Sequence, residues 1–220
     1  MLAIGLMSGT SLDGVDACLV DINQTTEIYK IKGFVCYPYD DKFKHKLLNI
    51  VSNNPTTIET ICSLNVEISL YYIKACEELL NKYQINKKDI KFIAMHGQTV
   101  WHHPKKDENF EASTLQLGDP SRLAAWGNTI VVSNFRAMDI SVGGEGAPLV
   151  PFANYILFSS KKENIALQNI GGIANVTYLK KNGKIEDIIA YDSGPGNILI
   201  DQACRIIYNK EFDDNGGCVA

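Results

Sequence analysis

The stretch from Gly5 to Asp21, GLMSGTSLDGVDACLVD, decides the fold that we expect for this chain. Apolar residues lead into a short turn of glycines and hydroxyl side chains, and apolar residues return before Asp21. The Asp13-Gly14 pair inside the stretch is typical of a tight turn. The pattern therefore predicts two strands joined by a hairpin whose tip is rich in glycine, hydroxyls and backbone N–H groups.

The chemistry of this tip allows two interpretations. Glycine lets the backbone approach a ligand closely, and hydroxyl and backbone N–H groups donate hydrogen bonds to phosphate oxygens. Asp13 and Asp16 supply hard oxygen ligands that suit Mg²⁺, directly or through a water molecule. The tip would then be an anion site, whereas the alternative is an ordinary hairpin with a polar end. This stretch alone leaves both interpretations open.

Length and composition indicate a globular chain with a sizeable core, and they argue against several functions. The 220 residues are 45% hydrophobic, which suits one large domain, or one domain and part of another. The formal net charge of −4 does not indicate a protein that binds nucleic acid. No apolar run reaches the roughly 18 residues of a membrane span. The N-terminus lacks a basic segment before its apolar residues, so we expect no signal peptide.

The cysteines are scattered along the chain and form no CxxC pair. Several lie within apolar patterns, so we expect buried free thiols in a reducing cytoplasm rather than a disulfide framework. The six residues are Cys18, Cys36, Cys62, Cys76, Cys204 and Cys218.

Periodicity and capping residues predict the elements that follow the hairpin. Apolar residues predict a strand over 29–39 and a short buried strand over 90–95. Asp40 or Asp41 caps a first helix, and Thr56 or Thr57 caps a long helix that runs to about residue 83. The other predicted elements are strands over 114–117 and 129–133, a helix from Asp119-Pro120 to Gly127, and a helix over 150–158.

Polar side chains follow two of these strands where the strands end. His96 and Gln98 come after the strand over 90–95, and Arg136 and Asp139 come after the strand over 129–133. The carboxyl end of a strand in an open α/β sheet is the usual place for a ligand, so His96 and Gln98 are candidate substrate residues. Arg136 could hold a carboxylate or a phosphate with two hydrogen bonds.

Structural roles for these residues remain open as alternatives. His96 could be satisfied by nearby backbone, and Arg136 could form a structural ion pair with Asp139. His102-His103-Pro104 predicts an exposed loop and not a metal site, because adjacent histidines point in different directions.

The opening pattern of strand, glycine turn, strand and strand occurs twice, at about 3–37 and at about 165–191. A repeat of this length implies two lobes of like topology, which we expect over 1–160 and 161–220, with a ligand cleft between them. The second copy lacks the later strands and helices of the first, so we expect a complete first lobe and a truncated second lobe.

Asp192 ends the third predicted strand of the second copy and precedes a helical pattern. A carboxylate beside a helix N-terminus is stabilised as the anion, and it can act as a base if a substrate proton lies within reach. The alternative role is to cap the helix or to anchor the loop.

At these residues the chain resembles the 1,6-anhydro-N-acetylmuramic acid kinases, a family of the actin-like sugar kinase superfamily. The resemblance covers essentially the whole chain, and six motifs in order make it specific. It implies an α/β, actin-like fold of two RNase-H-like lobes with ATP between them. The matching stretches are GLMSGTSLDGVD (5–16), HGQT (96–99), LQLGDP (115–120), GGEGAPLVP (143–151), NIGGIANV (169–176) and DSGPGN (192–197).

The resemblance also implies a reaction of cell-wall recycling. ATP and water are used to open the internal 1,6 ether of the anhydro sugar while O6 is phosphorylated, which yields N-acetylmuramic acid 6-phosphate. We expect ATP, Mg²⁺ and this sugar as partners, no nucleic acid and no membrane, and the sequence allows a homodimer.

The resemblance assigns roles to named residues. Asp192 would be the base that activates water, and Asp13 would meet Mg²⁺, directly or through water. Placement at the strand ends, supported by the matching stretches, indicates the residues of the substrate cleft: His96, Gln98, Arg136 and Asp139. The ATP phosphate loop would be Gly9, Thr10, Ser11, Leu12, Asp13, Gly14, Val15 and Asp16.

Two other functions stay open at this point. The chain could be an actin-like kinase for another substrate, or an inactive truncated module that binds a sugar or a partner. A Walker-type NTPase is disfavoured because no GxxxxGK[ST] motif occurs, and no dinucleotide fingerprint follows the first strand.

Overall fold

A computed structural model describes the chain over residues 1–9, 11–23, 25, 28–52 and 54–218. Thr10, one of the predicted phosphate-loop residues, lies outside the described residues. The chain divides into two compact units, Met1–Gly146 and Ala147–Ala220, and each is described here by itself. Both units combine helices with β-sheet, so the predicted α/β class is confirmed.

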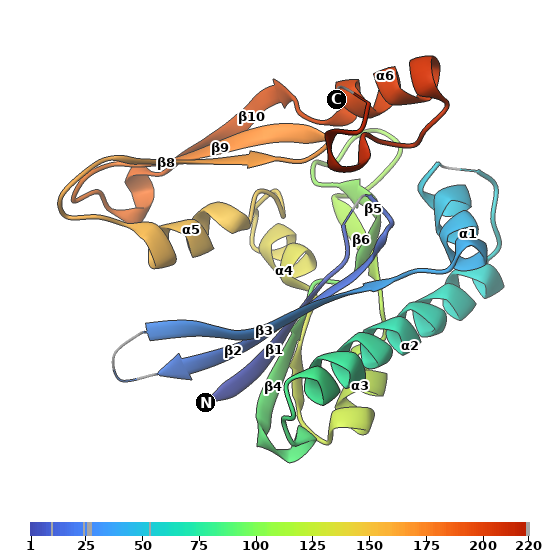
Figure 1. Ribbon diagram of the computed structural model, residues 1–220, viewed down its shortest axis with the longest axis horizontal. Helices are drawn as coiled ribbons and strands as arrows, with labels where there is room; N and C mark the ends of the chain where they lie inside the picture. Colours follow the sequence, from blue (N-terminus) through green and yellow to red (C-terminus); the bar gives the residue numbers. More distant parts are fainter. Residues whose placement is uncertain (10, 24, 26–27, 53, 219–220) are drawn as a thin grey trace. The chain divides into compact units, whose positions relative to one another are not determined.

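The first unit contains a five-stranded sheet of β1 (Leu2–Met7), β2 (Gly14–Asn23), β3 (Ile28–Pro38), β4 (Ile90–Met95) and β7 (Ile130–Val132). The order across the sheet is β3-β2-β1-β4-β7 (Figure 1). The first three strands form an antiparallel meander. On the other side of β1, β4 lies parallel to it, and β7 lies parallel to β4. The predicted hairpin is therefore the centre of this sheet.

Helices α1 (Asp41–Val51) and α2 (Ile58–Lys82) follow the meander and begin where the sequence predicts. Asp40 accepts a hydrogen bond from the backbone N–H of Phe43 at 2.9 Å, and Thr57 caps α2. α2 packs on β2 and β3. Each fully buried side chain contributes roughly 1.5–3 kcal/mol to folding. In this core these include Ile4, Leu19, Leu64, Ile68, Tyr72, Leu79 and Ile93.

A two-stranded hairpin of β5 (Gln98–His103) and β6 (Ser113–Leu117) follows β4. The prediction of a loop at His102-His103 is wrong, although His102 is exposed as expected. The two residues lie in β5 and pair across the hairpin with Thr114 and Ser113. The local residue pattern does not indicate this strand, because the strand that pairs with it lies ten or more residues further along the chain.

Two further helices complete the first unit. In α3 (Pro120–Gly127), Asp119 accepts a hydrogen bond from the Ser121 backbone N–H at 2.9 Å, and Pro120 stands at the first helical position, as predicted. Sequence analysis predicted no helix at α4 (Phe135–Ser141). Asn134 precedes α4 with a φ of 60°, so it turns the chain directly from β7 into the helix.

The second unit contains a second antiparallel meander, with the order β10-β9-β8. The predicted repeat of strand, glycine turn, strand and strand is therefore present in the structure. The elements are α5 (Val150–Phe158), β8 (Ile165–Ile170), β9 (Ile173–Leu179), β10 (Ile189–Pro195) and α6 (Ile198–Tyr208). Short 3-10 turns lie at Lys87–Asp89, Ile185–Asp187 and Asp214–Gly216.

The division between the units falls before α5 rather than after it. The sequence predicted lobes over 1–160 and 161–220, which would leave α5 in the first lobe. In the structure the Asn154 amide donates to Thr177 Oγ1 at 3.1 Å, and the Tyr155 hydroxyl donates to the Gly183 carbonyl at 3.2 Å. Both acceptors lie in the second meander or its turn, and α5 therefore belongs to the second unit.

All six cysteines are free thiols, but the prediction that they are buried is wrong for Cys36 and Cys62, which are exposed. Cys76 and Cys204 are buried. Among the described residues, no helix has both the length and the apolar character needed to cross a membrane.

We expect Gly14→Ala to destabilise the first unit by about 1–3 kcal/mol, because overpacking costs energy of that order. A Cβ at Gly14 would lie 2.9 Å from Pro38 Cα and closer still to the Tyr37 carbonyl oxygen. Gly5→Ala is the matched control, since no atom lies within 4 Å of a Cβ there. Urea unfolding measures both variants, and equal stabilities would contradict this view of the β2–β3 contact.

Candidate functional site

The turn between β1 and β2 is held from the protein side by buried groups. Ser8 is 3% exposed, and its hydroxyl lies 2.6 Å from the hydroxyl of the fully buried Tyr72 on α2. Leu12 adopts a φ of 53° and places its side chain in the core, where it is 2% exposed. These contacts fix the turn although it is rich in small polar residues.

The predicted phosphate-loop residues consequently fall into two groups. Leu12, Gly14 and Val15 are buried, and the side chains of Leu12 and Val15 belong to the core. Gly9 is partly exposed, and three polar side chains are exposed. These are Ser11, Asp13 and Asp16.

Gly9 occupies a position that the protein itself does not require to be glycine. Its φ lies outside the left-handed region, and a Cβ there would meet nothing nearer than Ser11 Oγ at 3.7 Å. Its carbonyl accepts a hydrogen bond from the Gln98 amide at 3.1 Å. Beside it, the Ser11 hydroxyl donates to Asp13 Oδ1 at 2.7 Å. At Gly9 the carbonyl is thus held by Gln98, while a Cβ would make only ordinary van der Waals contact with Ser11.

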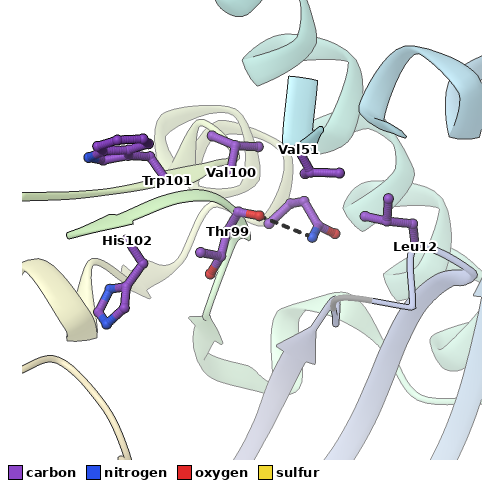
Figure 2. Close-up of a pocket in the computed structure, with 7 residues that line it drawn as sticks. Leu12, Val51, Thr99, Val100, Trp101 and His102 are labelled. Carbon is purple, nitrogen blue, oxygen red and sulfur yellow. Dashed lines mark hydrogen bonds between the residues drawn. The ribbon is translucent and has the colours of Figure 1, made fainter. Parts of the chain in front are cut away.

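Gln98 connects this tip to the β5–β6 hairpin. The side chain is 1% exposed, and its Oε1 atom has no hydrogen-bond partner among the described residues. A cavity of about 230 Å³ adjoins it. Figure 2 shows Val51 and Val100 close together at this cavity, with His102 pointing away from them. The lining residues are Leu12, Val51, Gln98, Thr99, Val100, Trp101 and His102.

His96 stands where β4 ends, and both of its ring nitrogens have protein partners. Its backbone N–H donates to the Leu6 carbonyl at 3.1 Å, which places it beside the end of β1. Nδ1 lies 2.7 Å from the Gly97 carbonyl, and Nε2 lies 2.9 Å from Nε of Arg136. A carbonyl only accepts and a guanidinium only donates, so the ring is neutral and carries its proton on Nδ1. Burial, and then the charge of Arg136, lower the pKa of His96.

Arg136 and Asp139 hold the same glycine from two sides and do not pair with each other. Arg136 Nη1 donates to the Gly146 carbonyl at 2.7 Å, and Asp139 Oδ2 accepts from the Gly146 N–H at 2.7 Å. A Cβ at Gly144 would collide with the Asp139 carboxylate, so a larger residue there would push the carboxylate away from Gly146. The structural Arg136–Asp139 ion pair that the sequence left open is not formed in the described part of the chain.

Asp192 lies within β10 of the second unit and is exposed. The prediction that it ends the strand is wrong, because the ladder shifts register between Asp192 and Gly194 and then continues to Pro195. Asp192 is paired with Asn175 on β9. The turn after β10 is fixed by the N–H of Asn197, which donates to the Gly171 carbonyl at 2.9 Å.

The first unit therefore joins Gly9 to Gln98 and His96 to Arg136 by direct hydrogen bonds, and His96 and Gln98 are two residues apart in the chain. Asp192 belongs to the second unit. Sequence reasoning missed Ser8, Tyr72 and Gly146. Tyr72 was counted only as part of an apolar helix stripe, and nothing in the sequence indicated its contact with Ser8.

The sheet order and the repeated meander define a mixed α/β protein with two antiparallel three-stranded meanders. The chain belongs to the anhydro-N-acetylmuramic acid kinase family, whose family model matches residues 1–220. It is 43% identical over 218 residues to the anhydro-N-acetylmuramic acid kinase of Clostridioides difficile, covering 98% of this chain and 57% of that protein. For the Francisella tularensis subsp. novicida enzyme the identity is 42% over 219 residues, with 99% and 58% covered.

The chain spans about 57% of the length of these curated relatives. Among solved structures it is similar to component A of the (R)-2-hydroxyglutaryl-CoA dehydratase of Acidaminococcus fermentans. The TM-score is 0.40 at 10% identity, covering 95% of this chain and 54% of that one.

Because the pKa of His96 is lowered on folding, we expect acid to destabilise the first unit through this residue. Between the lowered pKa and the ordinary one the unfolded chain binds more protons, so stability falls as the pH falls through that window. Unfolding free energies measured from about pH 7 to about pH 5 should drop more steeply for the native chain than for His96→Gln. Parallel pH profiles would contradict the neutral, buried ring.

Proposed function

We propose that this chain, alone or as part of a longer protein, binds ATP and 1,6-anhydro-N-acetylmuramic acid and catalyses hydrolytic ring opening with phosphorylation of O6. Membership of the family supports the proposal. The observation that carries it is the tip of the β1–β2 hairpin, where Gln98 holds the Gly9 carbonyl and a Cβ at Gly9 would make only ordinary contacts with Ser11. A glycine that neither backbone conformation nor packing requires is explained by the close approach of a ligand.

The residues of the tip fit a nucleotide phosphate chain with its metal. Ser11 can donate from its hydroxyl, and Asp13 offers a carboxylate at the exposed end of the turn. The described residues contain no group of three or more His, Cys, Asp or Glu placed to hold a metal. Mg²⁺ commonly takes one or two carboxylates and completes its shell with phosphate oxygens and water, so Asp13 would share the ion with ATP. ATP supplies the phosphoryl group, and the protein supplies position and charge.

On the sugar side, Arg136 is the residue best suited to an anion. It is half-buried and forms no ion pair with a carboxylate of the described chain. A cation in that state is stabilised by an anionic ligand. We place Gln98, His96 and Asp139 around it as residues of the substrate cleft.

Asp192 is the proposed base. Its carboxylate is exposed and forms no hydrogen bond or ion pair with another described residue, so it is free to accept a proton. Asp192 takes a proton from water as the water oxygen bonds to C1. The bond between C1 and O6 breaks, and O6 receives the phosphoryl group.

The function is tested by incubating the chain with ATP, ¹⁸O-water and the anhydro sugar and weighing the products. We expect one ¹⁸O at C1 and one phosphate at O6. Because the chain spans only part of its relatives, the second candidate is a binding module. ATP and sugar binding without product would favour that module, and failure to bind either ligand would contradict both candidates.

We expect Gly9→Ala to raise the dissociation constant for MgATP at least about tenfold, which corresponds to about 1.4 kcal/mol. The added methyl group would occupy the space left for a phosphate, while the fold has room for it. Stability should stay within about 0.5 kcal/mol of the native chain. Calorimetric titration measures the affinity, with Gly5→Ala as the control, and an unchanged affinity would argue against a phosphate site at the tip.

For a chain that turns over, Asp192→Asn should lower the rate at least about 100-fold, the lower range of a general-base contribution. MgATP binding should be unaffected, because Asp192 is not among the residues proposed to hold the phosphates and the metal. Glu186→Gln makes the same carboxylate-to-amide change at another exposed position of the second unit and should be neutral. Product formation by the Asn variant at the native rate would remove Asp192 from this role.

A further inference from the structure

We propose that His96 is a positioning residue that aims the guanidinium of Arg136 at an anionic group of the substrate while leaving its positive charge unneutralised. This inference rests on the proposed function and refines it, since His96 then acts through Arg136 rather than on the sugar. The anionic group is a carboxylate or a phosphoryl group, which share the same chemistry toward arginine.

The two ring nitrogens of His96 leave it nothing to offer a ligand. Nδ1–H donates to the Gly97 carbonyl at 2.7 Å, and Nε2 accepts from Arg136 Nε at 2.9 Å. A neutral imidazole has one donor and one acceptor, and both are used here. The backbone of His96 is held after β4 by its N–H, which donates to the Leu6 carbonyl at 3.1 Å.

Two neutral acceptors on different segments determine the direction of the Arg136 side chain. His96 lies after β4, and Gly146, whose carbonyl accepts from Nη1 at 2.7 Å, lies after α4. A guanidinium group carries five N–H donors in one plane, so these two contacts fix the orientation of that plane. Both Nη2 donors and one Nη1 donor remain available to a ligand. Those donors form the fork that binds an oxyanion with two hydrogen bonds.

The neutrality of both acceptors is the decisive point. A carboxylate at position 96 could also accept from Arg136 Nε, but it would cancel the charge that attracts an anion. In the described part of the chain no carboxylate forms an ion pair with Arg136. Asp139, three residues further along α4, instead accepts a hydrogen bond from the Gly146 N–H. The site therefore combines a fixed direction with a full positive charge.

Three substitutions separate these two properties. His96→Gln keeps a neutral acceptor and should remain within about threefold of the native KM for the anionic substrate. His96→Leu removes the acceptor and should raise that KM at least about tenfold. His96→Glu keeps an acceptor but neutralises the cation, and it should be at least as impaired as His96→Leu. His45→Leu, on the exposed face of α1, is the matched control and should be neutral.

Whether the anion belongs to the sugar or to the nucleotide is shown by which of the two ligands is affected by His96→Leu. If it is the sugar carboxylate, His96→Leu raises the KM for the sugar without changing MgATP affinity, and the effect disappears with a sugar whose carboxylate is an amide. If it is a phosphoryl group, kcat falls or MgATP affinity weakens instead. Either pattern supports the positioning role.

An NMR readout keeps the inference testable without turnover. In ¹⁵N-arginine-labelled chain, the Arg136 Nε–H signal should be protected from solvent exchange in the native and His96→Gln forms and lost in His96→Leu. The inference is overturned if this signal is unchanged in folded His96→Leu, or if His96→Gln is as impaired as His96→Leu. Absence of product from a native chain with a protected signal would instead count against the proposed function alone.

Discussion

The β1–β2 turn is pinned from inside the protein, and the rest of the first unit depends on that constraint. Ser8 bonds to Tyr72 in the core, Leu12 turns inward in a left-handed conformation, and Gln98 holds the Gly9 carbonyl. A short turn rich in glycine would otherwise sample many conformations. The buried groups on either side of the tip restrict Ser8 and Leu12, and the Ser11 hydroxyl donates to Asp13. Restriction of this kind is the preorganisation that the proposed phosphate site would need.

A second constraint is electrostatic and lies at the end of β4. Arg136 is oriented by His96 and by the Gly146 carbonyl, both neutral, so the protein directs the cation without satisfying its charge. Such an arrangement costs stability in the free protein, because a half-buried charge lacks its counter-ion. Functional sites commonly keep an uncompensated charge of this kind, which the bound ligand then neutralises. The two constraints meet where β4 leads into β5, because His96 follows β4 and Gln98 begins β5.

Local signals were read correctly from the sequence and long-range ones were not. The caps at Asp40 and Thr57 and the repeated meander need only nearby residues, and the structure has them where they were predicted. His102 was placed in a loop because its strand is defined by a distant partner. Asp192 was placed at a strand end because a register shift leaves no mark in the residue pattern. The structural pairing of Arg136 with Asp139 looked equally plausible until both were found bonded to Gly146.

The central claim is that the tip of the β1–β2 hairpin holds the phosphates and the metal of the nucleotide. Titration with Mn²⁺-ATP tests it directly, because the paramagnetic ion broadens the amide signals nearest to it. The account predicts that the signals of Gly9, Ser11 and Asp13 broaden first and recover when Mg²⁺ displaces Mn²⁺. Broadening that begins elsewhere in the first unit, with these three signals sharp at saturation, would contradict it.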